Sequence, residues 1–126
     1  MYDAQAGSIN VEDIATNSNN RLMLRRIKRN KETDIQDLYI QNHYDEEGER
    51  CVDYVPEGAN DMGWLGYFVG KNNHIKELYF RDFDNMSIDI IKPFLMGVNN
   101  NNSISVLHFR RTDLWWQDIY YAESFL

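Results

Sequence analysis

Apolar residues return along the chain three times in the same short pattern. The pattern is apolar-x-x-apolar-x-apolar, and it spans residues 35–40 (Ile-Gln-Asp-Leu-Tyr-Ile), 75–80 (Ile-Lys-Glu-Leu-Tyr-Phe) and 104–109 (Ile-Ser-Val-Leu-His-Phe). Residues two apart in a strand point to the same face, while the residue between them points to the other. The pattern therefore predicts three strands in a common register, with the first, fourth and sixth positions in the core.

The two later segments belong to a longer internal repeat. At the offset 104 − 75 = 29, residues 62–97 match residues 91–126 at ten of 36 positions without a gap. A period of this length predicts a stack of units, each burying its apolar face against its neighbours. We expect the three strands to form one parallel sheet in chain order, with Leu78 of the middle strand among the most buried residues.

Each predicted strand follows a stretch with helical character, at residues 21–30, 62–69 and 88–98. Residues 18–20 and 60–61 are candidate N-caps of the first two helices, and Pro93 is tolerable if the third begins near residues 87–89. Gly63, Gly66 and Gly70 each weaken the second helix by up to about 1 kcal/mol relative to Ala, so tertiary packing must hold it. A short helical turn is expected around residues 11–15.

The third unit, with Ile104, Leu107, Phe109, Thr112 and Leu114, resembles the leucine-rich repeat consensus. Its period and full helix are similar to those of the ribonuclease-inhibitor-like subclass. The first two units depart from the consensus at its ninth and eleventh positions, where they hold His43 and Asp45, and Phe83 and Asn85. The resemblance implies an α/β solenoid with a parallel sheet on the concave side, helices on the convex side, and protein binding without catalysis.

At 126 residues the chain is predicted to be one domain, with a polar segment 1–20 followed by units at about 21–61, 62–90 and 91–126. Strands one and two are 75 − 35 = 40 residues apart, so the first unit holds an acidic insertion of 11 residues within residues 42–61. The chain ends part-way through the next helical stretch. Either that helix closes the stack, or the chain is a piece of a longer solenoid.

The net charge of −7 disfavours a general polyanion binder and favours a neutral or basic partner. A single cysteine, Cys51, excludes a disulfide scaffold. The first residues do not resemble a signal peptide and no long apolar run is present, so we expect an intracellular protein, in the cytoplasm.

Three other kinds of site are less favoured by the sequence. Six of the thirteen Lys and Arg residues lie between positions 21 and 31, which suits nucleic acid or an acidic partner, although a solvated outer helix face is the simpler interpretation. A hydrolase would need His43 or His108 to work with an acid from the insertion. A zinc half-site would use His43 and Cys51, but closed zinc sites want four ligands.

No catalytic constellation, cofactor motif or calcium loop is recognisable, and the insertion's acidic residues (Asp45, Glu46, Glu47, Glu49 and Asp53) are expected to form a solvated loop. We therefore expect a protein that is not an enzyme and has no cofactor.

The predicted register places Tyr39, Tyr79 and His108 in one row, about 4.8 Å apart per strand, on the sheet face away from the helices. The flanking rows are Asp37, Glu77 and Val106; Gln41, Arg81 and Arg110; and Asn42, Asp82 and Arg111. Tyr and Arg are enriched at binding hot spots, although half-exposed strands also favour them for packing alone. The predicted partner-binding residues are Tyr39, Gln41, Glu77, Tyr79, Arg81, His108, Arg110 and Arg111.

The last twelve residues suggest a second surface. They include Trp115, Trp116, Ile119, Tyr120, Tyr121, Phe125 and Leu126, more apolar residues than one helix stripe can bury. We expect self-association through this C-terminal end.

Overall fold

The structure is a computed structural model that describes residues 2–32, 34–41, 52–81 and 87–110, with the side chains of residues 109 and 110 left out. It shows a mixed α/β fold with one small parallel sheet. The elements follow the chain in the order α1 (Tyr2–Gln5), the 3-10 turn η1 (Val11–Asp13), α2 (Ser18–Arg29), β1 (Asp37–Gln41), α3 (Ala59–Lys71), β2 (Glu77–Arg81), α4 (Ile88–Val98) and β3 (Val106–Arg110). No helix in the described ranges is long and apolar enough to cross a membrane.

The sheet confirms the predicted strand order and direction. Its order is β1-β2-β3, and both pairs are parallel. Leu78 lies in register with Leu38 and Leu107, as the shared apolar pattern requires. Each strand begins two residues later than the pattern predicted, at Asp37, Glu77 and Val106. Ile75, at the first apolar position of the pattern, is nevertheless fully buried.

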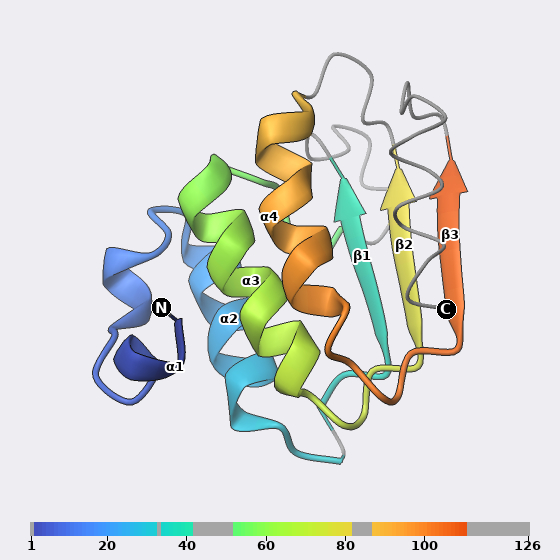
Figure 1. Ribbon diagram of the computed structural model, residues 1–126, viewed down its shortest axis with the longest axis horizontal. Coiled ribbons are helices and arrows are strands. Elements are labelled where there is room, and N and C mark those ends of the chain that lie inside the picture. Colours follow the sequence, from blue (N-terminus) through green and yellow to red (C-terminus); the bar gives the residue numbers. More distant parts are fainter. Residues whose placement is uncertain (1, 33, 42–51, 82–86, 111–126) are drawn as a thin grey trace.

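Helices and strands form two layers (Figure 1). Among the described residues, α2, α3 and α4 lie on one face of the sheet, and α3 and α4 connect successive strands. Leu78 is fully buried, as predicted, and the Phe80 ring meets the Phe94 ring of α4 edge to face at 5.3 Å between centroids. Alternation along the strands then turns Tyr39 and Tyr79 toward the opposite face. The core therefore lies between the sheet and the helices.

The helix boundaries correct two predicted caps. Asn17 caps α2, and its Oδ1 accepts a hydrogen bond from the backbone N–H of Asn20, so the helix starts earlier than predicted. The N-cap of α3 is Gly58, whose N–H donates to Asp61 Oδ1 at 2.6 Å. Asp61 is thus the third residue of the helix, and its side chain accepts a hydrogen bond from the N-cap backbone, as in a capping box. Helix α4 begins at Ile88, which confirms the expected start near residues 87–89.

Glycines let α3 and α4 approach until their backbones touch. A Cβ added to Gly97 would contact the carbonyl carbon of Gly66 and lie 2.6 Å from Tyr67 N. A Cβ added to Gly66 would lie 2.8 Å from Phe94 Cα and would meet the Phe94 carbonyl oxygen. Neighbouring backbone cannot rotate away as a side chain can. These glycines, which weaken the isolated helix, are therefore what allows the two helices to pack this closely.

The 29-residue repeat is also a repeat of contacts. The Asn72 side-chain amide donates to the carbonyl of Ile27 in α2 at 3.1 Å, and Asn101 donates to that of Val69 in α3 at 2.7 Å. Each asparagine's Oδ1 also accepts from the backbone N–H groups two and three residues further on, at 2.6–3.0 Å. Each asparagine therefore shapes its own turn and joins it to the C-terminal end of the neighbouring helix one unit earlier in the chain, α2 for Asn72 and α3 for Asn101.

The described end of the insertion, residues 52–58, is tied to the N-terminal end of α2. The Glu57 carboxylate accepts hydrogen bonds from Thr16 N and Oγ1, Asn17 N and Asn20 Nδ2, at 2.6–3.3 Å. The buried Asn20 side chain also pairs with both backbone groups of Val55. This part of the insertion is an anchor rather than a solvated loop.

We expect Glu57→Gln to lower the free energy of unfolding by about 1 kcal/mol at neutral pH, because a charged acceptor facing a helix N-terminus is lost. Partial burial acts to raise the pKa of Glu57, but the hydrogen bonds outweigh it and bring the pKa below the ordinary value of 4.5. A lowered pKa gives stability that is present above 4.5 and is lost as pH falls through the folded-state value. The difference in melting temperature between wild type and variant should therefore shrink on acidification, and a pH-independent difference would contradict the electrostatic account.

Candidate functional site

The predicted aromatic row is a continuous stack of rings across all three strands. The Tyr39 and Tyr79 ring centroids are 4.3 Å apart with the planes 10° from parallel, and those of Tyr79 and His108 are 4.2 Å apart at 2°. Tyr39 and Tyr79 are half-buried, and His108 is exposed. Because the rings use their faces to stack on one another, their edges and polar atoms are what they present away from the sheet. We call Tyr39, Tyr79 and His108 the ring stack.

An acidic row lies beside the ring stack, toward the start of the strands. Asp37 and Glu77 are direct register partners on β1 and β2, and Val106 continues the row on β3. The Tyr79 hydroxyl donates to Glu77 Oε2 at 2.5 Å. This hydrogen bond is the main cause of a Tyr79 pKa far above its ordinary value, so the phenol stays protonated and remains a donor.

The row on the other side of the ring stack differs from its prediction. The Arg81 guanidinium carbon lies 4.8 Å from the Tyr39 ring centroid, close enough for a cation–π contact. Gln41 is only 1% exposed, so it is not available to a partner. Beside it, residues 53–54 run along the outer edge of β1, and the Gln41 N–H donates to the Tyr54 carbonyl at 3.1 Å. The side chain of Arg110, and Asn42, Asp82 and Arg111 altogether, lie outside the described residues.

Asp53 belongs to this site, although it was expected in a solvated loop. Its Oδ2 accepts from the Tyr39 N–H at 2.9 Å, and its own N–H donates to the Tyr39 carbonyl at 2.9 Å. Burial raises the pKa of the Asp53 carboxyl. Asp53 thus fixes the backbone that carries the first ring. Asp45, Glu46, Glu47 and Glu49 lie outside the described ranges.

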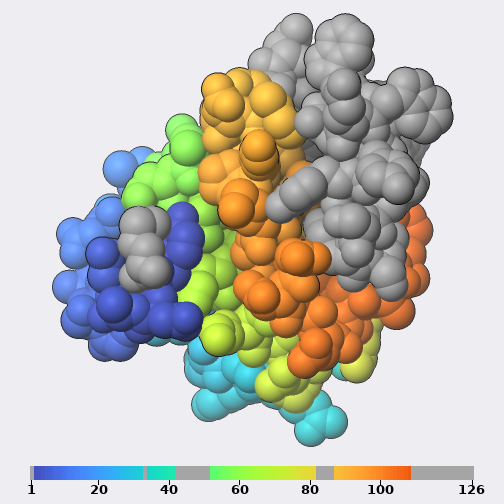
Figure 2. Space-filling view, viewed as in Figure 1, coloured from blue at the N-terminus to red at the C-terminus, as the bar shows by residue number. Residues whose placement is uncertain are grey.

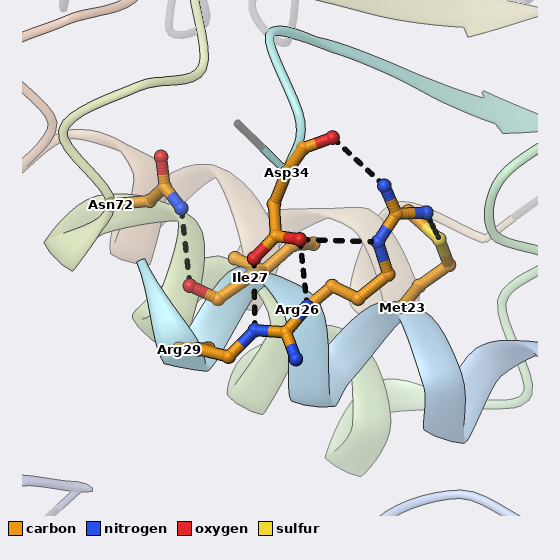
Figure 3. Close-up of polar contacts among 6 residues, drawn as sticks. All are labelled: Met23, Arg26, Ile27, Arg29, Asp34 and Asn72. Carbon is orange, nitrogen blue, oxygen red and sulfur yellow. Dashed lines mark hydrogen bonds and ion pairs between the residues drawn. The ribbon is translucent and has the colours of Figure 1, made fainter. Parts of the chain in front are cut away.

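Several cations of the basic helix α2 have partners within the chain. Figure 3 shows Arg26 and Arg29 converging on Asp34. Arg29 holds both carboxylate oxygens, at 2.9 and 2.7 Å, and Arg26 donates to the Asp34 carbonyl at 2.8 Å. The hydrogen bond from Arg29 is the main cause that lowers the pKa of Asp34.

Three further cations of this segment are also engaged. Arg25 pairs with Glu12, Arg21 donates to the Ala15 carbonyl, and Lys28 lies 5.7 Å from the centroid of the Phe68 ring. A helix whose cations already have partners within the chain offers less free positive charge to phosphates than its sequence suggests.

The candidate residues for metal binding and hydrolysis are only partly within the described chain. No three His, Cys, Asp or Glu side chains come together there to hold a metal ion. His108 stacks on Tyr79, and the hydrogen bonds among the described residues do not join it to a carboxylate. His43 and Cys51, proposed for a hydrolase or a zinc half-site, lie outside the described residues, as do the C-terminal aromatic residues expected to drive self-association.

A separate hollow of about 510 Å³ lies in the helix layer. Tyr2 of α1, Tyr67 of α3 and Met96 of α4 help to line it, and Figure 2 shows it between the N-terminal residues and α4. Met96 is 56% exposed. The hollow is large enough for a small ligand, but nothing among the described residues indicates which ligand or partner occupies it.

Sequence reasoning found the ring stack but missed Asp53 and the close helix contact at Gly66 and Gly97. The acidic insertion gave no period by which Asp53 could be placed, and a glycine in a sequence does not show what packs against it.

Comparison of the chain with models of protein families, with curated proteins and with solved structures finds no match.

Proposed function

We propose that this protein is a non-catalytic interaction module that binds another protein on the sheet face carrying the ring stack. The observation that carries the proposal is the stack itself, with neighbouring centroids 4.3 and 4.2 Å apart. Tyrosine offers a rigid apolar body with a polar tip, which suits a binding hot spot. Rings already held by their neighbours lose little side-chain freedom on binding, so less of the contact energy is lost to ordering.

The proposal includes a leucine-rich-repeat-like solenoid of three units, 21–61, 62–90 and 91–126, within a single domain. Each described unit is a helix followed by a parallel strand. The equivalent hydrogen bonds of Asn72 and Asn101 to the preceding helix support it, because stacked units repeat their nearest-neighbour contacts. In such a solenoid the ring stack lies on the concave side. A lone cysteine favours a reducing compartment, and we propose the cytoplasm.

The test uses the double variant Tyr39→Ala/Tyr79→Ala. We expect it to lose at least about tenfold in affinity for a partner captured by the wild-type protein, since hot-spot truncations of this kind cost 2 kcal/mol or more in total. Affinity should be measured by calorimetry with the purified partner. Circular dichroism of the variant must show a folded protein for the result to count as loss of the site.

The matched control is Leu22→Ala, which removes an apolar side chain 49% exposed on the helix layer. Its affinity should equal that of the wild type. A partner that binds the Tyr39→Ala/Tyr79→Ala variant as tightly as the wild type would show that the ring stack is not the binding site.

A further inference from the structure

The acidic row places two carboxylates, Asp37 and Glu77, side by side, and no Lys or Arg among the described residues forms an ion pair with them. Asp37 and Glu77 face each other directly across β1 and β2, where neighbouring parallel strands are about 4.8 Å apart. Like charges directly opposite each other on a sheet destabilise it. No Lys or Arg among the described residues forms an ion pair with either carboxylate, although Arg26 and Arg29 both reach Asp34. The pair is therefore a place where added positive charge would be favourable.

Both carboxylates can be reached from the sheet face that carries the ring stack. Asp37 is exposed, and Glu77 is half-buried. The Tyr79 hydroxyl holds Glu77 Oε2, which fixes the carboxylate next to the ring while leaving its second oxygen able to accept. The acidic pair and the rings thus form one surface, with apolar contact and negative charge side by side.

We infer that the partner presents a basic segment to this face, with an arginine or lysine between Asp37 and Glu77 and an apolar or aromatic neighbour on the edges of the ring stack. This inference rests on the proposed function and names the chemistry of its partner. An arginine fits best, because a guanidinium has five donors in a planar fork and can bond two carboxylates at once. A side chain is favoured over a metal ion, because the described residues form no group of three metal ligands.

The charge of the whole chain points the same way. A net charge of −7 attracts a basic segment from a distance, and the carboxylates of Asp37 and Glu77 are where its cation would bind.

The experiment titrates the full chain with a short peptide of arginine, tyrosine and glycine, followed by backbone amide shifts in NMR. The strongest shifts should fall on β1 and β2. The counterpart peptide with glutamate in place of arginine should bind at least about tenfold more weakly, as expected when two favourable ion pairs are replaced by repulsion.

Asp37→Asn/Glu77→Gln should weaken arginine-peptide binding about tenfold while leaving the melting temperature equal or higher, because the variant also removes the repulsion. The matched control, Asp13→Asn/Glu32→Gln, removes two exposed negative charges elsewhere and should bind as the wild type does. Equal weakening by both variants, amide shifts away from the sheet, or equal or absent binding of the two peptides would overturn the inference.

The outcome separates the two proposals. If a captured protein partner needs Tyr39 and Tyr79 but is indifferent to Asp37→Asn/Glu77→Gln, the interaction face stands and the basic partner does not. If the partner is indifferent to the Tyr39→Ala/Tyr79→Ala variant as well, the proposed function itself fails.

Discussion

Gly97→Ala is expected to lower the free energy of unfolding by about 2–3 kcal/mol, a large part of the stability of a small domain. The new Cβ would contact the Gly66 carbonyl carbon and lie 2.6 Å from Tyr67 N and 2.7 Å from Gly66 O. All of these are backbone atoms of α3, so the two helices must separate to admit the methyl group. Urea denaturation followed by circular dichroism measures the effect.

The direction of the change distinguishes packing from helix propensity. Propensity alone predicts that Gly→Ala in a helix stabilises by about 1 kcal/mol, whereas the close contact predicts the reverse. Gly7→Ala is the matched control, because nothing lies within 4 Å of its added Cβ, and it should change stability by less than about 0.5 kcal/mol. A Gly97→Ala variant more stable than the wild type would contradict the helix contact described for α3 and α4.

The two glycines of this contact should not act independently. Once an alanine at position 97 has moved the helices apart, a second one at position 66 meets a wider gap. We therefore expect Gly66→Ala/Gly97→Ala to cost less than the sum of the single variants, as is usual for residues that share one contact.

The sheet was predictable from the sequence because its information is local and periodic. Leu78 and Phe80 lie two apart, and the same spacing recurs in the other strands, so face and register followed from the period of a strand alone. The structure confirms the parallel order and the buried Leu78. Helix starts were less predictable, because Asn17 and the residues after it offer several candidate caps in a row and local sequence does not rank them.

The candidate site was predictable where it depends on the strands and not where it depends on the insertion. Tyr39, Tyr79 and His108 were placed by register, and the structure brings their rings together. Gln41 has the same periodicity but is buried, which the period of the strand does not predict. Residues 53–54 pair with the edge of β1. A pairing across an irregular loop has no period in the sequence, so the role of Asp53 could not be read from it.

The hydrogen bonds around Asp61 are another contact of the insertion that the sequence pattern does not predict. Asp61 Oδ2 accepts from the Tyr54 hydroxyl at 2.8 Å and from the Glu57 N–H at 3.0 Å, inside the fold. Burial raises the pKa of its carboxyl. A residue that resembled a surface cap in the sequence therefore joins the insertion to α3, and only the folded chain shows the two partners that come to it.

Leu78→Ala is expected to lower the free energy of unfolding by about 2–5 kcal/mol, because it leaves a cavity that the surrounding core fills only in part. Leu78 is fully buried in the central strand, between the register partners Leu38 and Leu107. Since a small domain is only marginally stable, we expect the variant to be largely unfolded at room temperature.

Leu22→Ala serves as the control for that substitution, because it removes the same atoms from a leucine that is 49% exposed on α2 and should change stability by less than about 0.5 kcal/mol. Denaturation curves of both variants should be compared at matched concentration. A cooperative melt of Leu78→Ala at the wild-type midpoint would mean that the strand does not hold the centre of the core. Loss of the melt in Leu78→Ala but not in Leu22→Ala would show that the sheet's inner face, which also positions the ring stack on its outer face, depends on this one side chain.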